Sequence, residues 1–131
     1  LWQSNIQVYA GNSVPRKRST DTIAINNWYH IVIVKSATAI NNIYINGVDK
    51  TLNSTGGWSG PIDTPQNKIG EGSFSGSNYN FTGNIDEVSI WNTALSSSAI
   101  TEIYNSGAPN DLESLTNASS SNLLAWYKMG E

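Results

Sequence analysis

The sequence predicts an all-β protein, an antiparallel β-sandwich that carries one short α-helix. Many short segments alternate apolar and polar residues, and turns rich in Gly, Asn and Pro separate them. A single stretch, residues 96–107, has helical spacing instead. The chain has 131 residues, enough for one compact domain, and it shows no internal repeat or linker. We therefore expect residues 1–131 to form a single domain.

The composition excludes several classes of partner. The formal net charge is -3, and 13% of residues are charged, against about 25% in an average protein. Such a surface has no strong long-range field for nucleic acid or anionic lipid. No apolar run is long enough to span a bilayer, so membrane insertion is not expected. Cysteine is absent, which removes disulfides and zinc–thiolate sites.

In the first third of the chain, residues 5–10 alternate and predict a strand, and the polar residues 11–21 predict a loop. The charge run at residues 16–18 fits a solvated loop. Residues 22–25 predict a short strand. Residues 26–37 are apolar on both faces, which favours a central strand covered on both sides, with Trp28 in the core. The single histidine, His30, is expected to be a hydrogen-bonded core residue.

Residues 41–52 predict a hairpin, because Asn46 and Gly47 both tolerate the positive φ of a tight type I′ turn. A long loop at 53–67, a strand at 68–74, a loop at 75–80 and a long strand at 81–92 follow. Ser96 is the predicted N-cap of the helix and Gly107 its stop. Residues 122–131 predict the last strand.

Four motifs resemble the laminin-G-like domains of the concanavalin A-like lectin/glucanase superfamily, and the pentraxin branch in particular. In chain order they are NNWYHIVIV, IYINGV, IGEGSF and GNIDEVSIWNTALSSSAITEIYNSG, within residues 26–107. The resemblance implies a jelly-roll β-sandwich of the concanavalin A-like kind. It says less about function, because this fold hosts lectins, glycosidases, adhesion modules and virion appendages.

Domains of this family have several strands before the Trp-x-His strand, whereas this chain has few residues there. The resemblance therefore implies that part of the sandwich is missing on the N-terminal side. A preceding segment of a larger protein or a neighbouring chain is expected to complete it. The isolated chain would then expose apolar sheet surface.

Asp86 and Glu87 raise the question of catalysis, because two acids stand side by side in an apolar segment. Retaining glucanases of the superfamily carry a Glu-x-Asp-x-Glu strand, whose alternate acids share a face. The matching frame here is Asn84-x-Asp86-x-Val88, which lacks both catalytic carboxylates. A structural role is the favoured interpretation: Asp86 would hold the loop before the helix, and Glu87 would face solvent. We expect no enzymatic activity.

Calcium is a second hypothesis, implied by the resemblance to pentraxins, which hold it with a carboxylate-rich loop after the Ile-Gly strand. Ca²⁺ needs several oxygen ligands. The corresponding loop here keeps only Glu71 as a carboxylate. Glu71 is therefore the one candidate metal ligand, for a weak Ca²⁺ site, and no other cofactor is expected.

The candidate ligand-binding residues lie in two Gly- and Ser-rich stretches. Trp58 and Tyr79 are aromatic residues in predicted loops, where a ring can stack on a sugar, and Asn78 and Glu71 supply polar groups beside them. The alternative is that both rings fold back onto the sandwich. We expect a non-catalytic binding or adhesion module for carbohydrate or another surface polymer, on an extracellular, cell-surface or virion protein. The alternative function is a structural or assembly domain of a phage particle or surface fibre.

Overall fold

The computed structural model describes residues 3–9, 15–36, 40–52, 68–74 and 77–130. Within these ranges the strands are β1 (Gln3–Tyr9), β2 (Pro15–Ala24), β3 (Ile31–Lys35), β4 (Ile40–Ile45), β5 (Val48–Asp49), β6 (Thr51–Leu52), β7 (Glu71–Phe74), β8 (Ser77–Asn80), β9 (Val88–Trp91) and β10 (Leu123–Tyr127). The α-helix is α1 (Ser97–Tyr104), and two 3₁₀ turns are η1 (Asn105–Gly107) and η2 (Ser120–Asn122).

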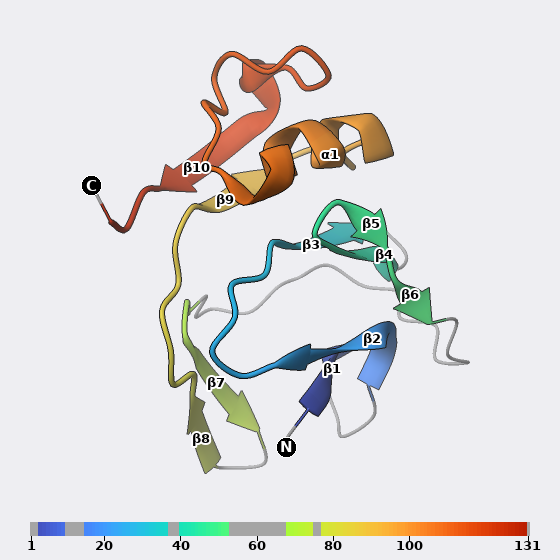
Figure 1. The fold of residues 1–131 in the computed structure, drawn as a ribbon, viewed down its shortest axis with the longest axis vertical. Coiled ribbons are helices and arrows are strands. Elements are labelled where there is room, and N and C mark those ends of the chain that lie inside the picture. The colour runs from blue at the N-terminus through green and yellow to red at the C-terminus, as the bar shows by residue number, and fades with distance from the viewer. Residues whose placement is uncertain (1–2, 10–14, 37–39, 53–67, 75–76, 131) are drawn as a thin grey trace.

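In the described residues the strands form four antiparallel sheets: β1-β2-β6, β3-β4-β5, β7-β8 and β9-β10 (Figure 1). The prediction of an all-β, antiparallel fold with one short helix is confirmed for the described part of the chain. Figure 1 shows α1 running between the β9–β10 ladder and the β4–β5 hairpin.

The two three-stranded sheets are joined through Lys50, the residue between β5 and β6. Its backbone nitrogen donates to the Ile43 carbonyl at 2.9 Å, and its carbonyl accepts from the Thr20 nitrogen at 2.6 Å. One residue later, the Thr51 hydroxyl accepts a hydrogen bond from the Ile43 nitrogen at 2.8 Å. Lys50 also pairs with Asp21 at 2.8 Å. This short segment therefore connects β4 with β2.

The core lies where α1 meets the β3–β4–β5 sheet. Its buried apolar residues are Val34, Ile40, Ile43, Ile45, Ala99, Ile100 and Leu112. The predicted Asn46-Gly47 turn is confirmed, with φ of 51° and 77°. Gly47 is required twice, because a Cβ there would also lie 3.1 Å from the Tyr104 ring of α1.

The helix begins as predicted. The Ser96 hydroxyl accepts a hydrogen bond from the Ala99 nitrogen at 3.1 Å, which caps the first turn. Ala99 is fully buried, so a glutamate at this position, as in a capping box, would bring a charge into the core. The end of the helix differs from the prediction. Asn105, in the left-handed region at φ 42°, stops α1 before Gly107 is reached.

Two segments predicted as loops contain strands. Residues 15–21 belong to β2, and residues 77–80 form β8. In β2 a polar side chain contributes hydrogen bonds to the pairing with β1. The buried Ser19 hydroxyl accepts from the Ile6 nitrogen at 2.9 Å and donates to the Asp21 carbonyl at 2.6 Å. Pairing with β1 and β6 overrides the weak strand propensity of this polar sequence.

The predicted central strand at residues 26–37 is shorter and less covered than expected. β3 begins at Ile31, and among the described residues it pairs only with β4, as an edge strand. Trp28 precedes it and is 67% exposed, so the prediction that Trp28 lies in the core is wrong. Ile31 and Ile33 are each 41% exposed, whereas Val34 is buried. An apolar pattern shows that a strand can be buried on both faces, but not which neighbours are present.

The predicted long strand at 81–92 is also shortened, to β9 alone. Glu87 has φ 52°, in the left-handed region, which interrupts the extended backbone just before Val88. Side chains before and after Glu87 therefore do not follow one strand alternation.

Candidate functional site

The adjacent acids Asp86 and Glu87 hold the end of the chain against β9. The Asp86 carboxylate accepts from the Glu87 nitrogen at 2.9 Å and from the Met129 nitrogen at 3.2 Å. The half-buried Glu87 accepts from the indole nitrogen of Trp126, on β10, at 2.6 Å. A structural role fits both acids, but with different partners from those expected. Glu87 does not face solvent freely, and Asp86 contacts the segment after β10, not the loop before α1.

The positions that would carry glycosidase carboxylates hold other residues. Asn84 is exposed, and Val88 is the first residue of β9. A retaining glycosidase needs two carboxyl groups about 5 Å apart on either side of the scissile bond. Asp86 and Glu87 are instead engaged with backbone and indole donors. The carboxylates of Asp86 and Glu87 therefore have structural hydrogen bonds.

The sequence-predicted binding residues concentrate on the β7–β8 hairpin. Its register pairs Glu71 with Asn80, Gly72 with Tyr79 and Ser73 with Asn78. The backbone register therefore brings Glu71, Asn78 and Tyr79 together on one hairpin. Trp58 lies outside the described residues, as do the side chains of Asn78 and Tyr79. Their joint role stays a prediction.

Glu71, the candidate metal ligand, is paired with a cation of the chain itself. Its carboxylate lies 2.6 Å from the Lys68 ammonium, and both side chains are partly exposed. A metal ion at Glu71 would have to compete with the Lys68 ammonium for this carboxylate. In the ranges that the structure describes, no cluster of three or more His, Cys, Asp or Glu residues is placed to hold a metal. Calcium binding through Glu71 stays a prediction.

The sequence analysis missed an aromatic residue at the base of this hairpin. Phe81 follows β8 directly and is 59% exposed, and its nitrogen donates to the Gly70 carbonyl at 2.8 Å. It stands beside the Glu71–Asn80 pair. A sequence signal for an exposed ring was present, because Phe81 directly follows the polar residues 75–80. The prediction instead made Phe81 the first residue of the long strand at 81–92.

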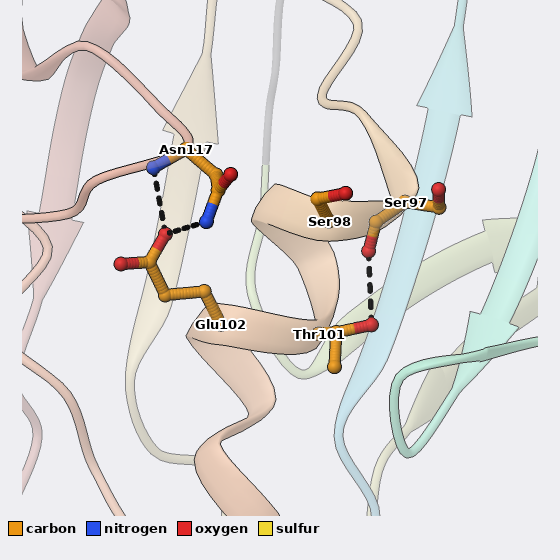
Figure 2. A pocket seen from close by; sticks show the side chains of 5 residues that line it. All are labelled: Ser97, Ser98, Thr101, Glu102 and Asn117. Carbon is orange, nitrogen blue, oxygen red and sulfur yellow. Dashed lines mark hydrogen bonds between the residues drawn. The ribbon is translucent and has the colours of Figure 1, made fainter.

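A shallow depression of about 440 Å³ lies beside the start of α1 and is lined by Ser97, Ser98, Thr101, Glu102 and Asn117. Figure 2 shows these five side chains. Glu102 accepts from the backbone nitrogens of Thr116 and Asn117 at 2.7 and 2.8 Å. Those two bonds hold the pKa of the Glu102 carboxyl below its ordinary value. The depression has no aromatic wall and its acid is already satisfied, so Glu102 acts as the anchor of the loop after the helix.

His30 joins the hairpin turn to the helix. Its backbone nitrogen donates to the Asn46 side chain at 2.9 Å, and its ring stacks on Tyr104 with centroids 5.8 Å apart. The expected hydrogen-bonded histidine is found only in part, because the buried Nδ1 has no hydrogen-bond partner within the described residues. Burial lowers the pKa of His30 below its ordinary value.

We expect His30 to make the fold less stable in mild acid. The unfolded chain binds a proton at the ordinary histidine pKa of about 6.5, whereas the folded chain binds it only at lower pH. The free energy of unfolding should therefore fall as the pH drops from about 6.5 to the folded pKa. His30→Phe keeps a ring against Tyr104 and should remove this part of the pH dependence. Urea titrations of both proteins across this range test it, and equal slopes against pH would contradict the assignment.

Comparison with known proteins decides the family. A laminin-G family model, described as the concanavalin A-like lectin/glucanases superfamily, matches residues 2–101. The chain belongs to this superfamily. The antiparallel ladders and single helix of this laminin-G-like domain agree with its all-β sandwich. No curated protein and no solved structure matches the chain.

The described residues of this laminin-G-like domain contain no helix that is both long and apolar enough to cross a membrane.

Proposed function

We propose that this laminin-G-like domain is a non-catalytic binding module that recognises glycans or another surface polymer. The proposal is carried by the family match: the chain belongs to a lectin/glucanase superfamily. At the positions of the glucanase Glu-x-Asp-x-Glu motif it has Asn84, Asp86 and Val88, so both catalytic glutamates are replaced. The fold of the family supports sugar binding, and the two acids that remain are used as structural ties. We further propose an extracellular setting, on a cell surface or a virion.

The proposed binding residues are Trp58, Asn78, Tyr79 and Glu71, with Phe81 as an exposed neighbour of the same hairpin. Rings offer the apolar C–H faces of sugars a flat surface, and Asn amides match their hydroxyl groups. The low charge of the chain favours neutral sugars over acidic ones.

A glycan array probed with the full-length protein, first in calcium and then in EDTA, tests the proposal. We expect binding of neutral glycans that falls by about tenfold in Trp58→Ala or Tyr79→Ala, as expected when one stacking contact is lost. Leu124→Ala is the control, because Leu124 is an exposed apolar side chain on β10, outside the proposed site. A loss of binding in EDTA and in Glu71→Gln would assign calcium to Glu71. Absence of binding to all glycans would contradict the proposal.

A structural role in assembly is the second candidate. It is favoured by the exposed apolar residues on one face of the edge strand β3, Ile31 and Ile33. An edge strand without a charged or proline residue at these positions can accept another strand. Sedimentation of the full-length protein and of Ile33→Lys would test this role. Association that is lost in Ile33→Lys, together with no glycan binding, would favour assembly over recognition.

A further inference from the structure

We propose that the turn Ile25–Trp28, between β2 and β3, is a second carbohydrate-stacking site, with Trp28 as its platform. This inference rests on the proposed function and assigns part of it to residues outside the β7–β8 hairpin. The ligand class is a neutral oligosaccharide.

The Trp28 ring is presented to solvent. Trp28 is 67% exposed, the largest exposed fraction among the large apolar residues that the structure describes, and the neighbouring Ile25 is 63% exposed. Tryptophan rings are usually buried for the most part in a folded protein. The exposed Trp28 ring therefore offers solvent a flat apolar surface. The C–H groups of a pyranose can pack on such a surface.

The turn that carries Trp28 is held on both sides. Before it, the Ala24 nitrogen donates to the Tyr29 hydroxyl at 3.1 Å, and inside it the Asn27 amide donates to the Ile25 carbonyl at 3.0 Å. After it, the His30 nitrogen donates to Asn46 at 2.9 Å. Asn26 adopts the left-handed conformation at φ 62°. These bonds fix the backbone of the turn, so little backbone freedom is lost there when a ligand binds.

Two asparagines directly precede Trp28 in the turn, and their amides suit sugar hydroxyls. Asn26 and Asn27 are both exposed. The Asn26 amide makes no hydrogen bond within the described residues, and the Asn27 amide oxygen accepts none there, so a donor and acceptors are available. The four residues of the turn carry no charge, which favours a neutral oligosaccharide over an acidic sugar or a charged peptide.

The test measures binding of soluble cello-, laminari-, xylo- and chito-oligosaccharides to the full-length protein by calorimetry. The variants are Trp28→Ala, Trp28→Phe, Asn26→Ala and the control Leu124→Ala, which changes a residue of similar exposure on β10. We expect at least one oligosaccharide to bind, with an affinity about tenfold lower in Trp28→Ala, a smaller loss in Trp28→Phe and Asn26→Ala, and none in Leu124→Ala. Because Trp28 is so exposed, Trp28→Ala should keep the circular dichroism and melting temperature of the parent. If Trp28→Ala is less stable than the parent, the affinity of Trp28→Phe, which keeps an aromatic ring, is compared instead.

Four outcomes separate the two claims. Binding that falls in Trp28→Ala but not in the control supports the site. Binding that is equal in Trp28→Ala, while the Trp58 and Tyr79 variants lose it, overturns the second site and leaves the proposed function standing. No binding of any oligosaccharide to the parent, on the array or by calorimetry, overturns both. Self-association that Trp28→Ala removes, without any sugar binding, overturns the site in favour of a protein contact.

Discussion

Ile43→Ala is expected to lower the free energy of unfolding by about 2–5 kcal/mol, the usual range for removing a fully buried isoleucine side chain. Ile43 has no solvent exposure. It lies on β4, and its backbone nitrogen and carbonyl bond to Thr51 and Lys50 at the junction of the two three-stranded sheets. The substitution would leave a cavity at the point where the sheets join the helix layer. Urea denaturation monitored by tryptophan fluorescence measures the loss.

The matched control is Ile33→Ala. Ile33 stands directly opposite Ile43 in the β3–β4 ladder, on the same face, but it is 41% exposed. Its truncation removes the same atoms from a site that water already reaches, so the cost should be about 1 kcal/mol or less. If Ile33→Ala cost as much as Ile43→Ala, the Ile33 side chain would be covered in solution, which would contradict its exposure in this structure.

Glu87→Ala is expected to cost about 1–3 kcal/mol of stability. It removes the acceptor of the half-buried Trp126 indole N–H, whose hydrogen bond to Glu87 measures 2.6 Å and joins β10 to the start of β9. Glu87→Gln keeps an acceptor and should cost less. A double-mutant cycle with Trp126→Phe isolates the pair, because the two single costs should not add. Additive costs would show that the indole and the carboxylate are not partners.

The sequence predicted the fold where local rules and tertiary structure agree. The Asn46-Gly47 turn and the Ser96 cap depend on a few neighbouring residues, and both are found as expected. The prediction was wrong where residues distant in the sequence determine the local structure or the burial. Ser19 belongs to a strand because Ile6 bonds to it, and Trp28 is exposed because no described segment covers it.

The candidate site was predicted less well than the fold, for a physical reason. The adjacent acids were placed in one long strand with Glu87 facing solvent, but the backbone at Glu87 is left-handed and its carboxylate accepts from Trp126. Glu71 was expected in a loop and is the first residue of β7, and its pairing with Lys68 follows only from the folded geometry. Trp28 was assigned to a strand and to the core, and Phe81 to the start of the strand predicted at 81–92. Their exposure depends on where each strand begins, which sequence patterns fix poorly.

Retention of the full-length protein on insoluble neutral polysaccharides, with the release of reducing ends followed in the same tubes, tests the central claim most directly. We predict that the protein is retained on at least one polysaccharide and releases no more reducing ends than a boiled sample. Reducing ends above that level would contradict the structural role of Asp86 and Glu87 and would make the protein a glycosidase. No retention on any polysaccharide would contradict the binding function itself.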